Sequence, residues 1–264
     1  MTLYETLGRA RARLVAAGIP EPEALVDVDL YARTILGWDK ARLLIEQQSP
    51  VPEQLEPTLS TWITRRTQRE PSAYIVGHRE FWGLDFNVTP AVLIPRPETE
   101  SIVDEAVARA RSLPSPRLAD IGTGSGCIAI AVAVEVPRGR FVATDISEDA
   151  LAVARANALR HKVADRVEFI RTSYLDGIED GFDVITANPP YVKDTDKPGL
   201  SHDVRHEPDV ALFGGVEGLR DITGVLATAS TALIPGGWLV MEFGYGQEPD
   251  VEELVEMQDR KSVV

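Results

Sequence analysis

The chain has 264 residues, enough for one large domain and a smaller one. Its 44% hydrophobic and 26% charged residues are ordinary for a globular protein, and its net charge of −14 argues against a protein dedicated to binding nucleic acid. The single cysteine, Cys127, excludes a disulfide framework or a thiolate metal site. No stretch resembles a signal peptide or reaches the roughly 18 apolar residues of a membrane span, so we expect a cytoplasmic protein without a membrane partner.

Helical periodicity dominates the first 72 residues. Apolar residues from Leu3 to Ala17 recur at helical spacing, and a second helix is predicted from Pro22 to Ile35, before Gly37. A short third helix over 41–45 and a fourth over 52–69 follow. The pattern predicts a small helical bundle over residues 1–72.

Three arginines, Arg65, Arg66 and Arg69, cluster near the end of the fourth predicted helix. Cations are favoured there by the helix dipole, so an exposed and solvated face explains them. The alternative is a patch that binds a partner.

Aromatic and β-branched residues with glycines, from Tyr74 to Val88, predict a β-hairpin that links the two domains over residues 73–90. The larger domain then spans 91–264. Two prolines hold Arg96 in an extended segment, either for a surface salt bridge or at the mouth of a pocket. A helix starts at Pro97, where Thr99 can cap it or bond locally.

Short apolar strands alternate with helices through the larger domain, which predicts a parallel, doubly wound α/β sheet. A turn is expected at Pro235-Gly236-Gly237, between a helix and the last strand. The expected strands are 118–121, 141–145, 167–170, 183–187 and 238–243.

A glycine turn, Gly122-Thr123-Gly124-Ser125-Gly126, follows the first of these strands and lets a ligand approach the backbone. Cys127, behind the turn, is expected to be a small core residue. Asp145 ends the next strand and can accept both hydroxyls of a ribose, and Tyr174 can lie against a flat base. The turn lacks the Lys-Ser/Thr pair of an ATP site, so an adenosyl ligand without phosphates fits better.

Asn188-Pro189-Pro190-Tyr191 follows the strand 183–187, at the edge where ligands bind in open α/β sheets. The Asn188 side-chain oxygen and the Pro189 carbonyl are two acceptors on a stiff backbone, suited to a planar NH2 group. Tyr191 adds a ring for stacking. Asn-Pro and Pro-Pro are also common in turns, so the alternative is a turn without a binding function.

Together these residues resemble the class I S-adenosylmethionine-dependent methyltransferases and, more narrowly, the protein-(glutamine-N5) methyltransferases that modify peptide chain release factors. The resemblance covers residues 1 to about 247. Asn-Pro-Pro-Tyr alone is shared with adenine and other amino-group methyltransferases, whereas the segment 94–100 and the helical front end are more specific. The matching segments are 71–77, 81–84, 93–100, 120–126, 188–191, 212–219 and 235–237.

The resemblance implies a Rossmann-like methyltransferase domain, S-adenosyl-L-methionine as cofactor, and the glutamine of a Gly-Gly-Gln loop in a release factor as substrate. It assigns substrate recognition to the N-terminal domain. We also expect a monomer, and the net charge of −14 predicts no stable nucleic-acid binding. No metal site is expected. The implied catalytic residues are Asn188, Pro189, Pro190 and Tyr191; the implied cofactor-binding residues are Gly122, Thr123, Gly124, Ser125, Gly126, Asp145, Tyr174 and Asn188.

The sequence departs from the family pattern at two places. Ser173 stands where the family usually has an acid beside the adenine aromatic. After Gly246 only 18 residues remain, room for one helix but not for two further strands, so we expect a shortened sheet with an exposed edge, as in a truncated or frame-altered chain. The short C-terminus leaves an inactive relative that binds the cofactor as one alternative. The others are an adenine-N6 or other amino-group methyltransferase, which shares Asn-Pro-Pro-Tyr, and the related ribosomal-protein glutamine methyltransferases.

Overall fold

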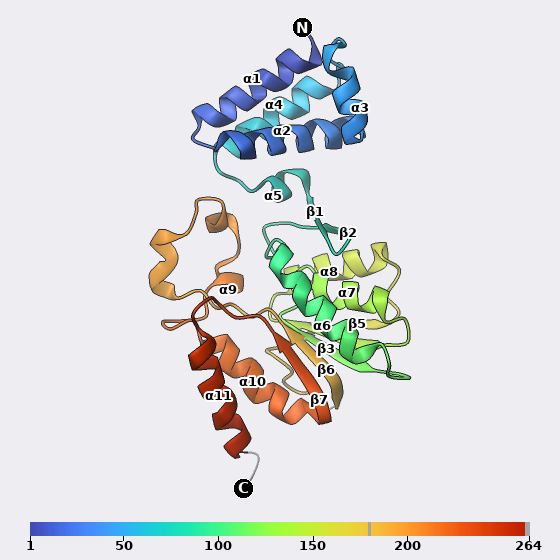
Figure 1. Cartoon of the computed structure of the whole chain (residues 1–264), viewed down its shortest axis with the longest axis vertical. Coiled ribbons are helices and arrows are strands. Elements are labelled where there is room, and N and C mark those ends of the chain that lie inside the picture. Colours follow the sequence, from blue (N-terminus) through green and yellow to red (C-terminus); the bar gives the residue numbers. More distant parts are fainter. Residues whose placement is uncertain (179–180, 262–264) are drawn as a thin grey trace. The chain divides into compact units, whose positions relative to one another are not determined.

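The computed structural model describes residues 1–178 and 181–261 (Figure 1). These residues form two compact units. The first comprises Met1–Gly77 and the short segment His202–His206, and the second comprises His78–Ser201 and the chain from Glu207 onward.

The first unit is a bundle of helices, as the periodicity predicts. A capping box begins α1, where Thr2 and Glu5 each accept a hydrogen bond from the other's backbone N–H. Gly37 ends α2 with a φ of +64°, as expected for a glycine stop signal. The helices are α1 (Leu3–Ala16), α2 (Glu21–Leu36), α3 (Lys40–Ile45), the 3₁₀ turn η1 (Glu46–Gln48), α4 (Leu55–Thr67) and α5 (Ser72–Val76).

The predicted hairpin is shorter than expected, because Ser72–Val76 is helical rather than extended. Pro71 precedes this turn of helix and Gly77, with a φ of +83°, ends it. Tyr74 and Ile75 are buried, and Ile75 joins the core of the bundle. Burial against the bundle therefore outweighs the strand preference of these β-branched and aromatic residues.

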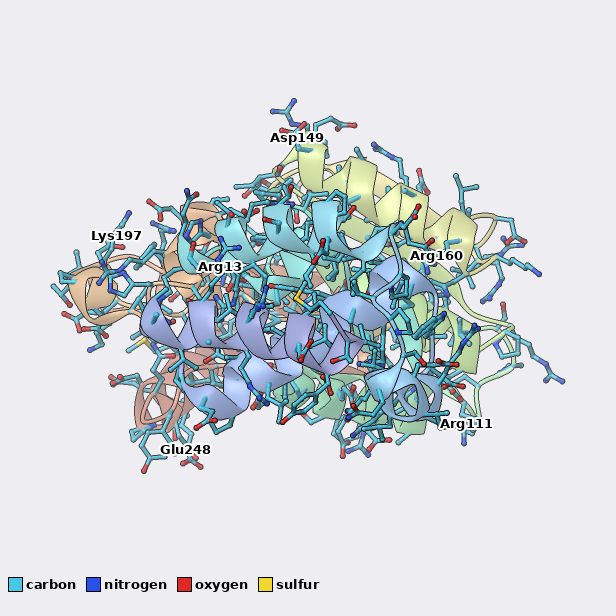
Figure 2. All side chains as sticks on the ribbon, turned by 90° about the horizontal axis from the view of Figure 1, so that it is seen from above. Arg13, Arg111, Asp149, Arg160, Lys197 and Glu248 are labelled. Carbon is cyan, nitrogen blue, oxygen red and sulfur yellow. The ribbon has the colours of Figure 1, made fainter. Side chains whose placement is uncertain are left out.

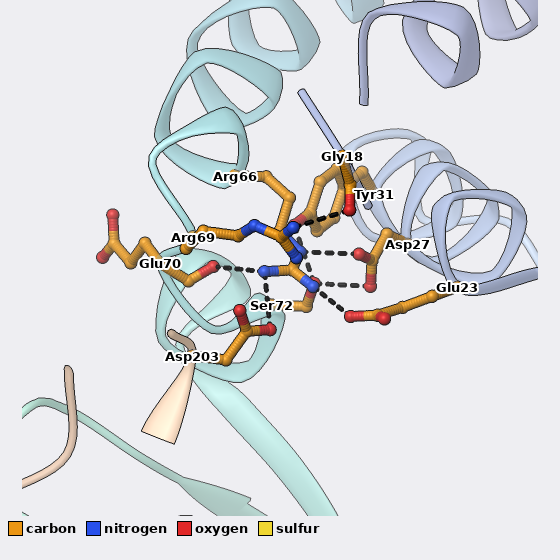
Figure 3. Close-up of polar contacts among 9 residues, drawn as sticks. All are labelled: Gly18, Glu23, Asp27, Tyr31, Arg66, Arg69, Glu70, Ser72 and Asp203. Atoms are coloured by element: carbon orange, nitrogen blue, oxygen red, sulfur yellow. Dashed lines mark hydrogen bonds and ion pairs between the residues drawn. The ribbon is translucent and has the colours of Figure 1, made fainter. Parts of the chain in front are cut away.

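Both interpretations of the arginine cluster are wrong for Arg66, which is 1% exposed and whose polar contacts are drawn in Figure 3. Its guanidinium bonds Asp27 at 2.7 Å and Asp203 at 2.8 Å, and it also pairs with Glu23. Arg66 is therefore the buried centre of an ion network in the first unit, and Asp203 holds the segment His202–His206 to α4.

The neighbouring arginines have separate partners. Arg65 pairs with Glu70 at 2.5 Å, and Arg69 donates to the carbonyl of Gly18 at 2.6 Å. All three arginines thus bond within the first unit.

The second unit contains a hairpin and an open sheet with helices on both faces (Figure 1). Its helices and 3₁₀ turns are η2 (Pro97–Thr99), α6 (Glu100–Ala110), α7 (Cys127–Glu135), α8 (Glu148–Arg160), η3 (Asp194–Gly199), α9 (Asp209–Leu212), α10 (Arg220–Ala232) and α11 (Glu248–Lys261). The 3₁₀ turn η4 (Val204–His206) lies in the segment that belongs to the first unit. Its strands are β1 (His78–Phe81), β2 (Leu84–Asn87), β3 (Arg117–Ile121), β4 (Arg140–Asp145), β5 (Val167–Arg171), β6 (Phe182–Ala187) and β7 (Leu233–Met241).

The larger sheet has the strand order β5-β4-β3-β6-β7, and all its pairs are parallel. From the central strand β3 the chain proceeds outward through β4 and β5, then crosses to the other side of β3 for β6 and β7. The strand order therefore reverses between β3 and β6, the place where open α/β sheets bind ligands. This confirms the predicted doubly wound, Rossmann-like architecture.

Successive residues of the central strands face opposite layers, as strand geometry requires. Leu118 and Phe141 pack into the core cluster that contains α6 and α7, whereas Ala119 and Val142 pack into the cluster with α10. Helices α6, α7 and α8 accordingly lie on one face of the sheet, and α10 and α11 lie on the other (Figure 1).

The last strand differs in one respect from the expectation. Residues Pro235–Gly237 form no separate turn but lie within β7 as a bulge. Phe182 pairs with Leu233 and Val184 pairs with Trp238, so β7 has extra residues between Leu233 and Trp238. Gly236 has a φ of +84°, which the bulge requires. β7 lies at an edge of the described sheet and Trp238 is 49% exposed, as expected for a shortened sheet; residues 262–264 lie outside the described part.

Charged side chains such as Arg111, Asp149 and Arg160 lie at the periphery of the second unit and are exposed (Figure 2). Among the described residues, no helix is long and apolar enough to cross a membrane.

Candidate active site

A cavity of about 420 Å³ lies in the second unit beside the carboxyl ends of β3 and β6. It occupies the place where the strand order reverses. Gly126 and Tyr191 do not line it. The predicted site residues that line it are Gly122, Thr123, Gly124, Ser125, Asp145, Tyr174, Asn188, Pro189 and Pro190.

The glycine turn presents backbone to this cavity. Gly122 and Gly124 have φ values of +69° and +55°, a region that favours glycine. The Thr123 N–H donates to the carbonyl of Thr144 at 2.8 Å, which ties the turn to β4. A Cβ at Gly122 would meet no atom within 4 Å, so the turn leaves open space for a ligand.

Gly126 has a different role in this structure. It precedes α7 with a φ of +81°, and a Cβ there would lie 2.8 Å from Ile130 Cδ1 and 3.1 Å from Ala154 Cβ. It therefore permits close packing of α7 against α8. Cys127 is buried as predicted, and burial raises the pKa of its thiol to about 12, which argues against a nucleophile.

Asp145 lines the cavity and accepts two hydrogen bonds from the backbone. Its Oδ2 accepts from the Gly124 N–H and its Oδ1 from the Ser147 N–H, each at 2.9 Å. Burial raises the pKa of this carboxyl, and the backbone donors oppose that shift. A carboxylate has about four acceptor sites, so Asp145 retains capacity for ligand hydroxyls.

Tyr174 is held in place by α10. Its hydroxyl donates to Asp221 Oδ1 at 3.1 Å, and burial together with the Asp221 charge raises its pKa to about 12. Its ring lies so close to Gly224 that a Cβ there would fall 2.1 Å from the ring. Sequence reasoning missed Asp221 and Gly224, because nothing local links them to a residue some 50 positions away.

Asn188 belongs to a chain of hydrogen bonds. Its Nδ2 donates to Thr99 Oγ1 at 3.0 Å, and Thr99 Oγ1 donates to Glu242 Oε2 at 2.8 Å. The Tyr191 hydroxyl donates to Glu242 Oε1 at 3.1 Å, and burial with the Glu242 charge raises the Tyr191 pKa to about 12. Tyr191 thus stabilises the segment 188–191 without lining the cavity.

Close backbone packing fixes the conformation of the residues that follow Asn188. A Cβ at Gly214 would lie 2.4 Å from the Pro190 carbonyl oxygen, and one at Gly218 would lie 2.2 Å from that of Tyr191. Val192 N–H also donates to the Leu212 carbonyl at 2.9 Å. The segment 212–219, which matches the family pattern, therefore braces Pro190 and Tyr191.

Asp120 lies beneath the site and was not predicted to take part. It is 2% exposed and accepts hydrogen bonds from Thr123 Oγ1 at 2.6 Å and Thr186 Oγ1 at 2.7 Å. These bonds tie the glycine turn to β3 and β6. Burial without a cation raises the Asp120 pKa to about 6. The position of Asp120, two residues before Gly122, was the sequence feature that could have identified it.

The charges of the lining suit an adenosyl sulfonium better than a nucleotide. The two basic residues among them, Arg96 and Arg220, pair with Glu207 and Asp221 respectively. The buried Glu207 also accepts from the Ile94 N–H at 2.9 Å, which orders the segment at the cavity wall. Both arginines of this lining are thus already ion-paired, whereas Asp145 and the glycine turn remain for hydroxyls and a carboxylate. Ser173 also lines the cavity.

Comparison with known proteins covers both units. The Methyltransferase small domain family matches residues 105–207, and the PrmC N-terminal domain matches residues 5–77. The catalytic domain of hMettl16, solved with a MAT2A 3′UTR hairpin, superposes with a TM-score of 0.55 at 17% identity, covering 76% of this chain and 73% of that one. That likeness concerns the fold alone.

Relatives over nearly the full length are named release factor glutamine methyltransferase. The protein from Moorella thermoacetica is 41% identical, over 96% of this chain and 89% of its own. The one from Geobacter sulfurreducens is 40% identical, over 95% and 87%. The one from Bradyrhizobium diazoefficiens is 39% identical, over 92% and 83%. With its cavity at the sheet switch point and this similarity across both units, the chain belongs to the release factor glutamine methyltransferase family.

Proposed function

We propose that this protein transfers a methyl group from S-adenosyl-L-methionine to the side-chain amide nitrogen (N5) of the glutamine in the Gly-Gly-Gln motif of a peptide chain release factor. The observation that carries the proposal is that the glycine turn and Asn188 line the same cavity. A cofactor held by the turn and an amide held by Asn188 would therefore meet. Family membership adds the class of substrate.

The residues of the chain divide between holding the cofactor and orienting the amide. Gly122–Ser125 and Asp145 would hold the amino-acid and ribose parts, and Tyr174 would lie beside the adenine. When bound, S-adenosyl-L-methionine supplies an electrophilic methyl group on a sulfonium.

The Asn188 carboxamide oxygen and the Pro189 carbonyl oxygen would accept hydrogen bonds from the two N–H groups of the substrate amide. This raises electron density on a nitrogen whose lone pair is delocalised, and it stabilises the positive charge that develops there. Holding the nitrogen in line with the methyl group supplies further rate enhancement.

Mass spectrometry of a release factor incubated with this protein and S-adenosyl-L-methionine tests the proposal. We expect one added methyl group on the Gly-Gly-Gln peptide, and none when that glutamine is replaced by glutamate. DNA and RNA incubated with labelled cofactor should remain unlabelled. Methylated nucleic acid, or a release factor unmodified at the motif, would refute the proposal.

We also propose a division of roles between the two domains, a monomeric state and a cytoplasmic location. The N-terminal domain, residues 1–72, would recognise the release factor, with residues 73–90 as the link to the methyltransferase domain at 91–264. The enzyme would act as a monomer in the cytoplasm, without stable nucleic-acid binding; its net charge of −14 supports the last point.

A further inference from the structure

Four side chains from three separate segments of the second unit form one directed chain of hydrogen bonds. Asn188 Nδ2 donates to Thr99 at 3.0 Å, Thr99 donates to Glu242 at 2.8 Å, and Tyr191 donates to Glu242 at 3.1 Å. Thr99 precedes α6 and is 2% exposed, and Glu242 directly follows β7. The Glu242 N–H also donates to the Ala187 carbonyl at 3.1 Å, which fixes the carboxylate beside the end of β6.

The direction of this chain is set by Glu242. An ionised carboxylate only accepts hydrogen bonds, so both hydroxyls that reach it must donate. Once the Thr99 proton points to Glu242, its oxygen offers lone pairs to its other neighbour. Asn188 must then present its NH2 to Thr99, because the flipped amide would place two acceptors against each other.

We propose that Thr99 and Glu242 are positioning residues for methyl transfer, which lock the Asn188 carboxamide with its NH2 toward Thr99 and its oxygen free for the substrate amide. This inference rests on the proposed function, because the oxygen is useful only if the substrate offers N–H groups. A flipped Asn188 would offer the substrate amide a second set of donors and repel it.

The Thr99→Val variant tests the lock, since valine retains the shape and removes the acceptor. We expect kcat for release-factor methylation to fall about tenfold or more, the factor that loss of one well-formed hydrogen bond produces, with S-adenosylhomocysteine affinity unchanged. Thr231→Val is the matched control: Thr231 is exposed on α10 and bonds the Thr228 carbonyl at 3.0 Å, so its kcat should stay at the wild-type value.

The Thr99→Ser variant separates positioning from packing. Serine keeps the hydroxyl and loses the buried methyl, so a positioning role predicts near wild-type kcat, whereas a packing role predicts damage at least as large as in Thr99→Val. Glu242→Gln should lower kcat as well, because a glutamine can donate to Thr99 and reverse the chain. Wild-type kcat in Thr99→Val, or equal loss in Thr99→Ser, would overturn the inference.

A second readout needs no turnover. The chain has three asparagines, Asn87, Asn157 and Asn188, so ¹⁵N-asparagine labelling yields three pairs of side-chain amide signals. In Thr99→Val we expect the Asn188 pair to shift and to exchange faster with water. The other two pairs serve as internal controls. The Asn157 side chain forms its hydrogen bonds with the backbone of Ser125 and Asn87, not with Thr99.

The two readouts keep the inference and the proposed function apart. If the wild-type protein fails to methylate a release factor, the proposed function is wrong, whatever the amide signals show. If the wild type is active and the Asn188 signals are unchanged in Thr99→Val, the lock is wrong and the function stands.

Discussion

Arg66 in the first unit and Asn188 in the second each anchor a network of hydrogen bonds, but the two networks differ in whether they are closed. Around Arg66 the guanidinium meets three carboxylates, and Asp27 takes a further bond from Ser72 at 2.5 Å. Around Asn188 the chain ends on a carboxamide that lines the cavity and whose oxygen accepts no hydrogen bond from the residues that the structure describes. The first arrangement holds the fold together, and the second is available for a ligand.

Breaking the closed network should have the largest effect on stability. Arg66→Met leaves the buried Asp27 without its cation, and we expect the free energy of unfolding to fall by about 3–5 kcal/mol. Arg65→Met makes the same change on the adjacent residue, whose partner Glu70 is part-exposed, and should cost about 1 kcal/mol or less. Urea denaturation of both variants measures the difference, and equal losses would contradict the comparison.

Breaking the open network should affect activity rather than stability. Asn188→Ala removes an acceptor aimed at developing charge, and we expect kcat to fall by about 10²–10³ or more. Its affinity for S-adenosylhomocysteine, measured by calorimetry, should fall far less than kcat, because the glycine turn and Asp145 still hold the cofactor, and its unfolding midpoint should change little. An active Asn188→Ala variant would remove the central residue from the proposed mechanism.

Asp120 represents a third kind of environment, because it is a buried carboxylate bonded to hydroxyls rather than to a cation. Its folded-state pKa of about 6 lies above the value of about 3.9 expected in the unfolded chain. Protonation therefore favours the folded state: the stabilisation is full below the unfolded pKa and is lost as the pH rises through about 6.

Asp120→Asn should remove this dependence. The wild type minus variant difference in unfolding free energy should be about 1 kcal/mol larger at pH 5 than at pH 7, as measured by urea denaturation at both values. Because the other carboxylates are common to both proteins, they cancel in this difference. A difference that is constant, or that grows with pH, would show that Asp120 is ionised in the folded protein throughout this range.

Much of the second unit follows from local patterns. The glycine turn, the Ser147 cap that accepts from Ala150, and the burial of Cys127 all depend on residues within a few positions of one another. The parallel sheet follows from alternating strands and helices. Asn188 was found because a strand that ends in two prolines places its last residue at the ligand-binding edge.

The residues missed or misread depend on distant partners. Arg66 looks like a surface cation until α2 and the segment at Asp203 enclose it, and Ser72–Val76 looks extended until the bundle buries it. Thr99 and Glu242 are 143 positions apart and meet only because the sheet brings the end of β7 beside Asn188.

Turns, caps and strand ends could therefore be predicted from local residues, since a local hydrogen bond or an apolar period needs only a few adjacent positions. The pairing of buried polar groups could not, because a buried polar side chain forms its hydrogen bonds with whichever partner the fold brings near. Arg66 shows this for stability. Thr99 shows it for the site, where its partners determine which atom of Asn188 is left to meet a substrate.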